Sequence, residues 1–251
     1  MNWTEEKRLK EIDYILSTIE SSFEFVHFTF SLRGISRSLT HQIVRTRSQT
    51  GNQHDVSIQQ QSQRTVNLQK FNYVTPPAIR YNEEALDEYN KTMDYLDSQY
   101  HKLINLGVPV QDARNLMPTG VETSMIIKLD LRTLSHMVQE RLCLRAQREI
   151  RDVVISMCNQ VLLVYPWLEK ILRPYCSKNG VCRFENFHDC PVKGTIFNPN
   201  TGKPWLMDSS YKGKFIDHRV DKQRSATKDE IHTQWMDAID DFEAIPDMQK
   251  K

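Results

Sequence analysis

The stretch VETSMIIKLDL, residues 121–131, is rich in β-branched residues, which favour extended backbone and predict a strand. A helical pattern follows it over about residues 133–165, where Pro166 is expected to stop or kink the helix. Upstream, apolar residues recur with a helical period over residues 82–106, and Gly107 ends that run. The sequence therefore predicts a strand with a long helix on either side of it along the chain.

Another strand is predicted nearer the N-terminus, in HFTFSLR, residues 27–33, where apolar and polar residues alternate. Ser36 is a candidate N-cap for a short helix in SRSLTHQIVRTR, residues 36–47. An opening helix is predicted after Thr4, because apolar residues recur at helical spacing from Leu9 onward. The strands and helices therefore come mixed along one chain.

Composition excludes several classes of protein. The formal charge of +1 lacks the basic excess of a nucleic-acid-coating protein, so no nucleic-acid partner is expected. No stretch approaches the roughly 20 apolar residues of a membrane span, so no membrane is expected either. The five cysteines are an odd number in a sizeable chain, which favours reduced thiols and a cytoplasmic setting. Because no glycine-rich phosphate loop occurs, side chains must bind any phosphate.

The stretch RTRSQTGNQHDVSIQQQSQR, residues 45–64, concentrates arginine and glutamine. Arg45 and Arg47 stand at the end of the predicted helix, and a polar loop is predicted from Ser57 to Arg64. Guanidinium groups together with amides and hydroxyls suit a phosphorylated, amide-bearing ligand such as a nucleotide. The alternative is a polar loop that binds no ligand.

A second group of arginines lies on the predicted helix 133–165. Arg141, Arg145 and Arg148 stand at i, i+4 and i+7, which places them on one face of a continuous helix. They form either part of an anion site or ordinary surface ion pairs with neighbouring glutamates such as Glu140.

Four blocks of the sequence, in order, resemble the flavin-dependent thymidylate synthase family. Residues 21–30, SSFEFVHFTF, resemble its SPFEHxxFTF segment, and ARNLMP, residues 113–118, resembles ARxxLP. The helix ending HQIVR, followed by SIQQQSQR at residues 57–64, resembles the family's HQxxR helix and its RHRxxSxxxxSxR signature. Residues 131–151, LRTLSHMVQERLCLRAQREIR, are similar to NxRSLxHFLxLRxxxxAQxEIR.

The resemblance implies a reaction, a fold and an assembly. Family members make dTMP from dUMP, with methylenetetrahydrofolate as carbon donor, FAD as hydride carrier and NADPH as reductant. The implied fold is an α+β fold with an antiparallel sheet and long helices. The implied assembly is a homotetramer in which subunits share active sites.

The resemblance also assigns residues by position. Arg141 takes the place of the arginine thought to favour ionisation at uracil N3 and is the expected catalytic residue. The residues expected to bind dUMP are Gln42, Arg45, Gln60, Ser62, Gln63, Arg64, Arg114 and Arg141. Those expected to contact FAD are Ser21, Arg45, Arg47, Gln60, Asp130, Arg132 and His136.

The chain departs from the family pattern at several of these places. Thr46 replaces the histidine of RHR, and SQTGNQHDV, residues 48–56, is an insertion within the signature. Ile19 stands where the family has a histidine near the flavin, and Asp130 replaces an asparagine. These changes leave two alternatives open: a flavin-dependent methyl- or hydroxymethyltransferase acting on dUMP or dCMP, and a degenerate member that binds nucleotide without turnover.

The composition changes near residue 175. We therefore expect a catalytic domain over residues 1–175 and a C-terminal extension of unknown role over residues 176–251. Four potential zinc ligands in the extension lack the close CxxC pairs of reliable zinc sites, so no metal is expected; they are Cys176, Cys182, His188 and Cys190.

Overall fold

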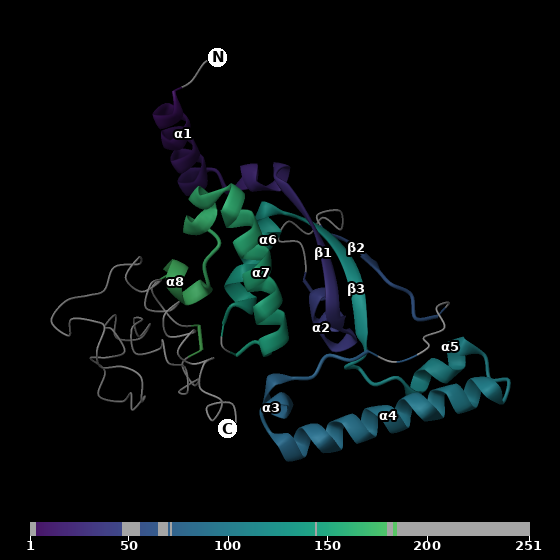
Figure 1. Cartoon of the computed structure of the whole chain (residues 1–251). Helices are drawn as coiled ribbons and strands as arrows, with labels where there is room; N and C mark the ends of the chain where they lie inside the picture. Colours follow the sequence, from purple (N-terminus) through teal and green to yellow (C-terminus); the bar gives the residue numbers. More distant parts are fainter. Residues whose placement is uncertain are drawn as a thin grey trace. The chain divides into compact units, whose positions relative to one another are not determined.

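The computed structural model describes residues 4–46, 56–64, 70, 72–143, 145–179 and 183–184 (Figure 1). Arg47, residues 48–55 of the predicted insertion and nearly all of the predicted C-terminal extension lie outside these residues, whereas Val56, the last residue of the predicted insertion, is described. Helices predominate and accompany a small antiparallel sheet, which confirms the α+β prediction. None of the helices in the described part of the chain combines the length and apolarity needed to cross a membrane.

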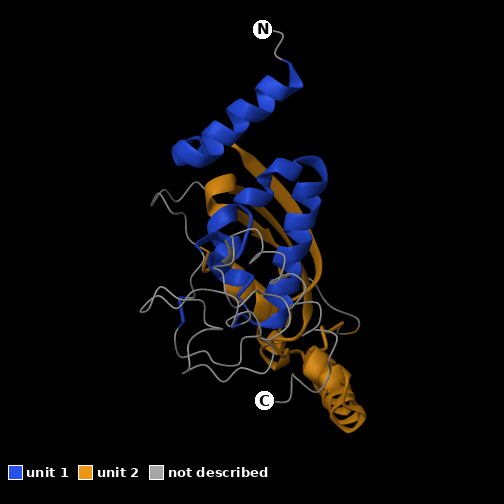
Figure 2. Ribbon diagram, turned by 90° about the vertical axis from the view of Figure 1, so that its left-hand side faces the viewer, with its two compact units in different colours: residues 1–24, 134–251 blue, residues 25–133 orange. Residues whose placement is uncertain are grey.

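The chain divides into two compact units, coloured separately in Figure 2. One consists of residues 25–133, which we call the sheet unit, and the other of residues 1–24 together with 134–251, which we call the helical unit. Each is described below by itself.

The sheet unit contains β1 (His27–Ser36), β2 (Val56–Gln60) and β3 (Glu122–Asp130), in the order β1-β3-β2 (Figure 1). Both outer strands run antiparallel to β3. On β3 the buried residues Met125, Ile127 and Leu129 alternate with residues that are more exposed, as the period of two requires. The strands predicted at residues 27–33 and 121–131 are thus confirmed.

An irregularity interrupts β1 close to its end. The register against β3 shifts between Leu32 and Ile35, and Gly34 lies there with a φ of +68°. Glycine adopts this left-handed conformation without the steric cost that a Cβ would impose. Beyond it, Ser36 caps α2 (Arg37–Ile43): its side chain accepts a hydrogen bond from the Leu39 N–H at 3.0 Å, as predicted.

The remaining helices of the sheet unit follow β2. They are α3 (Pro77–Arg80), α4 (Glu83–Asn105), α5 (Val110–Ala113) and the 3-10 turn η2 (Arg114–Leu116). Asn82 caps α4 by accepting from the Ala85 N–H, and Gly107 follows its end with a φ of +86°, so the helix predicted at residues 82–106 is confirmed. Tyr100 of α4 forms a buried hydrophobic cluster with Ala113 and Val121.

The helical unit contains α1 (Glu5–Thr18), most of α6 (Leu131–Arg141), α7 (Arg148–Val164), the 3-10 turn η3 (Pro166–Lys170) and α8 (Tyr175–Asn179). Another 3-10 turn, η1 (Glu20–Phe25), follows α1. Six residues of α7 are buried, and Pro166 stops this helix as predicted, because the residue before a proline avoids helical backbone.

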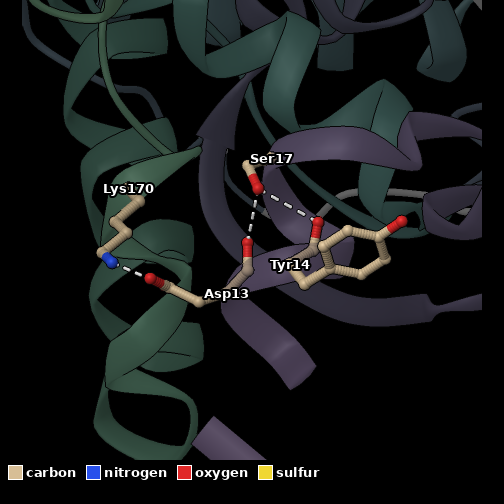
Figure 3. Close-up of polar contacts among 4 residues, drawn as sticks. All are labelled: Asp13, Tyr14, Ser17 and Lys170. Carbon is tan, nitrogen blue, oxygen red and sulfur yellow. Dashed lines mark hydrogen bonds and ion pairs between the residues drawn. The ribbon is translucent and has the colours of Figure 1, made fainter. Parts of the chain in front are cut away.

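An ion pair joins α1 to η3 within the helical unit, as Figure 3 shows. Lys170 Nζ lies 2.5 Å from Asp13 Oδ1. Ser17 donates to the backbone carbonyls of Asp13 and Tyr14 on the same helix, at 2.8 Å and 3.0 Å. Because both side chains of this pair are exposed, it is worth at most about 1 kcal/mol.

Candidate active site

The core of the candidate site in the sheet unit is Gln60, the last residue of β2. Backbone pairing places it opposite Met125 of β3, which fixes the direction of its side chain. Its Nε2 donates to Thr40 Oγ1 at 3.1 Å, and Thr40 is a buried residue of α2. The hydrogen bond therefore ties the end of β2 to the helix that carries Gln42.

The loop after β2 is also held by hydrogen bonds. The Gln61 N–H donates to the Ser124 carbonyl at 3.0 Å, and the Arg64 N–H donates to Ser62 Oγ at 3.2 Å. Gln63 Nε2 is buried and has no hydrogen-bond partner among the described residues. A buried amide donor without an acceptor is costly, so an acceptor supplied by a ligand would stabilise it.

The structure corrects one prediction for this segment. Residues 57–60, predicted as the start of a polar loop, belong to β2, and the loop begins at Gln61. Val56 and Ile58 alternate with Ser57 and exposed Gln59, which is the period of two that a strand requires. Glutamine is a poor indicator of strands, and the hydrogen bonds to β3 stabilise the strand instead.

Three further predicted residues lie elsewhere in the sheet unit. Gln42 is half-buried on α2, and Arg45 is exposed in the turn after that helix ends at Ile43. Arg114 begins η2, and its Nε donates to the Gln111 carbonyl at 3.0 Å.

Asp130 has a structural role at the junction of β3 and α6. The residue is 1% exposed, and its Oδ1 accepts a hydrogen bond from the Thr133 N–H at 2.6 Å. This is the geometry of an N-cap, which satisfies one of the free amides in the first turn of α6. Arg132 follows in that turn and is half-buried.

In the helical unit the candidate residues are His136 and Arg141 of α6, together with Ser21, which is exposed in η1. Burial lowers the pKa of the His136 imidazole, and the positive charges of Arg183 and Arg141 lower it further. The neutral imidazole is therefore favoured at neutral pH, and it carries one hydrogen-bond donor and one acceptor.

The structure also corrects the predicted helix 133–165. It is two helices, because α6 ends at Arg141 and α7 begins at Arg148. Arg145 lies in the connection between them, so the three arginines do not share a helix face. Gln147, with φ −57° and ψ 141°, has the extended backbone of the residue that precedes a helix.

Two residues of this neighbourhood had no signal in the sequence. Arg183 forms an ion pair with Glu140 of α6, and its guanidinium lies 3.8 Å from the centroid of the Tyr175 ring. The guanidinium of Arg145 lies 4.1 Å from the centroid of the Phe184 ring. Contacts between residues so far apart in the chain follow from the fold and not from any local pattern.

Part of the candidate set is thus grouped within each unit. In the sheet unit Gln60, Ser62, Gln63 and Arg64 lie on β2 and in the loop that follows it. In the helical unit, His136 and Arg141 lie near enough for the charge of Arg141 to lower the pKa of His136.

The described residues include no group of three or more histidine, cysteine or acidic side chains that could hold a metal ion. Cys182, His188 and Cys190 lie outside the described residues. Burial raises the pKa of the Cys158 thiol to about 12, so this cysteine is a buried apolar side chain and not a thiolate.

Comparison with known proteins yields a consistent set of relatives. The family model described as thymidylate synthase complementing protein matches residues 1–167. The chain is similar to the flavin-dependent thymidylate synthase of Nitratidesulfovibrio vulgaris, with 35% identity over 191 residues, 70% of this chain and 74% of the relative. The protein of the same name from Clostridium tetani is 37% identical over 71% of this chain and 76% of its own length. That of Pyrococcus furiosus is 37% identical over 65% of this chain and 67% of its own length.

Proposed function

Because this chain belongs to the family of flavin-dependent thymidylate synthases, we propose that it catalyses the reductive methylation of dUMP to dTMP. The proposed carbon donor is methylenetetrahydrofolate, the cofactor FAD and the reductant NADPH. The proposed working form is a homotetramer, the proposed setting cytoplasmic, and the proposed catalytic domain spans residues 1–175.

One structural observation supports a nucleotide site most directly. The side-chain amide of Gln63 is buried without a hydrogen-bond partner among the described residues, next to a strand whose last residue is held by Thr40. Such an amide matches the carbonyl and phosphate oxygens of dUMP. The proposed dUMP-binding residues are Gln42, Arg45, Gln60, Ser62, Gln63, Arg64, Arg114 and Arg141.

The residues proposed to hold FAD also have suitable chemistry. They are Ser21, Arg45, Arg47, Gln60, Asp130, Arg132 and His136. Arg45 is exposed and presents a fixed positive charge to a diphosphate. Arg132 and His136 are four residues apart on α6, and His136 favours the neutral form that can donate and accept. Since Oδ1 of Asp130 accepts the Thr133 N–H, a contact from Asp130 would use its other oxygen.

Bound FAD would supply the hydride chemistry, and the chain would supply binding, orientation and electrostatics. The arginines bind the phosphate of dUMP with paired hydrogen bonds, in place of a glycine-rich loop. Arg141 stabilises negative charge on the uracil ring, which raises the nucleophilicity of C5 without an enzyme nucleophile. In this scheme none of the cysteines takes part in the reaction.

A direct experiment tests the proposal. The purified full chain should release FAD on denaturation, oxidise NADPH faster when dUMP is present, and convert dUMP to dTMP, as identified by mass spectrometry. A hydroxymethylated product, or turnover of dCMP, would favour the alternative that the departures from the family pattern leave open. Protein that binds dUMP but gives no product with any reductant would identify a non-catalytic member.

Gln63 offers a second test. Gln63→Met keeps the length of the side chain and removes the unsatisfied amide, so stability should stay the same or rise. The KM for dUMP should rise about tenfold, as the loss of about 1.4 kcal/mol of binding implies. Gln59→Met, on the exposed side of β2, is the matched control and should leave both quantities unchanged. Equal KM values for the two variants would remove Gln63 from the site.

A further inference from the structure

Two residues beyond α8 contact the region where α6 ends, all within the helical unit. Arg183 pairs with Glu140 and stacks on Tyr175, and Arg145 stacks on Phe184. The contacts of these two residues thus consist of one ion pair and two arginine–aromatic stacks. We call Arg183 and Phe184 the clasp.

The clasp contacts the residues on either side of Arg141. Glu140 precedes Arg141 in the last turn of α6, and Arg145 follows it in the connection to α7. In this connection the Leu142 N–H donates to the Val138 carbonyl at 3.1 Å, the Ala146 N–H donates to the Cys143 carbonyl at 2.8 Å, and Arg151 Nη1 lies 3.5 Å from the Ala146 carbonyl. Arg141 is the last residue of α6, and the last carbonyls of a helix have no partners within that helix. Side-chain contacts therefore contribute to the placement of Arg141.

The charges near His136 also indicate that Arg183 and Glu140 contribute to the placement of Arg141. Arg183 and Arg141 both lower the pKa of His136, so the two cations are close to one imidazole. Like charges at short range repel, and Glu140 supplies the negative charge that offsets this repulsion. The side chains of Arg183 and Glu140 are only 36% and 31% exposed, so water screens their pair less than a surface ion pair. The family pattern quoted above has leucine at the position of Glu140, so this pair departs from that pattern.

We propose that Arg183 is a positioning residue, which holds the C-terminal end of α6 through Glu140 so that Arg141 is presented to the nucleotide. The inference rests on the proposed function, since it assigns Arg141 to dUMP. Arg183 itself needs no contact with the substrate. The anion that Arg141 meets is a nucleotide monophosphate or its ionised base.

The experiment uses the full chain with FAD and compares four proteins: the unchanged chain, Arg183→Met, Glu140→Arg, and the swapped pair Glu140→Arg with Arg183→Glu. Arg183→Met and Glu140→Arg should each lower kcat/KM for dUMP about tenfold, because a small displacement of Arg141 weakens its transition-state contact. The swapped pair should recover most of that loss. The KM for dUMP should rise while the KM for NADPH does not change, whereas general loss of folded protein would lower kcat and leave both KM values unchanged.

Lys178→Met is the matched control, because it removes another cation of the same region whose ion pair is with Glu20, at 4.0 Å. It should leave kcat/KM unchanged. Unchanged kcat/KM in Arg183→Met would overturn the inference, and so would failure of the swapped pair to recover activity.

Calorimetric titration with dUMP separates this inference from the proposed function. Arg183→Met should bind dUMP about tenfold more weakly, a loss of about 1.4 kcal/mol. If the unchanged chain binds dUMP but makes no dTMP, the proposed function fails while the affinity comparison still tests the clasp. Equal dUMP affinities of the unchanged chain and Arg183→Met would overturn the inference whatever the product.

Discussion

The end of β2 carries candidate site residues, and the connection between α6 and α7 directly follows one, Arg141, but the two segments are held in different ways. Backbone hydrogen bonds to β3 fix β2, so the direction of each side chain follows from its register. The connection after α6 depends on side chains, among them Arg151, Arg183 and Arg145. A segment held by its backbone should tolerate side-chain changes, whereas a segment held by side chains should not.

The largest effect should come from Arg141→Ala. If Arg141 stabilises charge on the uracil ring, its loss should lower kcat/KM for dUMP about 100- to 1000-fold. Alanine is a good helix former, so α6 should remain intact. Arg80→Ala, which removes an exposed arginine of α3, is the control for steady-state kinetics. Similar losses in the two variants would remove Arg141 from the chemistry.

A large effect on stability is expected from Arg151→Met. Arg151 is 3% exposed and its Nη1 lies 3.5 Å from the Ala146 carbonyl, so the change removes a buried guanidinium and its hydrogen bond to the connection. We expect a loss of about 3 kcal/mol in the free energy of unfolding, measured by urea denaturation. Arg148→Met, which breaks a more exposed pair with Asp152, should cost less than about 1 kcal/mol. Equal losses would show that the connection does not depend on Arg151.

A smaller effect should follow Gln60→Ala in the strand. The variant loses the hydrogen bond to Thr40, at a cost of about 1 kcal/mol. Because backbone pairing with β3 persists, the amides of β2 should keep their protection in hydrogen exchange. Gln59→Ala, which changes an exposed residue of the same strand, is the control. Lost protection in Gln60→Ala would break the contrast between the two regions.

The smallest effect concerns pH. The pKa of His136 is lowered in the folded protein, so below its ordinary value of about 6.5 the unfolded chain binds a proton that the folded chain does not. Stability should therefore fall as the pH drops below about 6.5, until the lowered pKa is passed, by less than about 1.4 kcal/mol for each pH unit. His136→Gln should make the urea midpoint less sensitive to pH between 7.5 and 5.5. An unchanged dependence would show that His136 carries no such shift.

The sequence predicted the elements whose stability is local. The helix at 82–106 has a cap, a period and a terminating glycine, and the strand at 121–131 is rich in β-branched residues. Ser36 is a cap candidate because serine is among the residues preferred at N-caps, and its hydroxyl accepts the Leu39 N–H in the structure.

The predictions that the structure corrects concern segments whose conformation depends on contacts between residues far apart in the chain. The strand β2 has only Val56 and Ile58 as apolar signals, and its pairing partner is more than 60 residues away. The break after Arg141 contains neither glycine nor proline, so propensity alone favours a continuous helix. Residues 183–184 contact the break from outside, and no local pattern could place them there. The assignment of individual site residues to dUMP and FAD stays a prediction.

The cap at Asp130 also bears on how such a site changes during evolution. Asparagine and aspartate are about equally good N-caps, so the exchange of one for the other leaves the start of α6 intact. It nevertheless alters the charge at the junction of β3 and α6 by one unit. Because either residue can cap α6, the charge at the proposed FAD site can change during evolution without loss of the helix start.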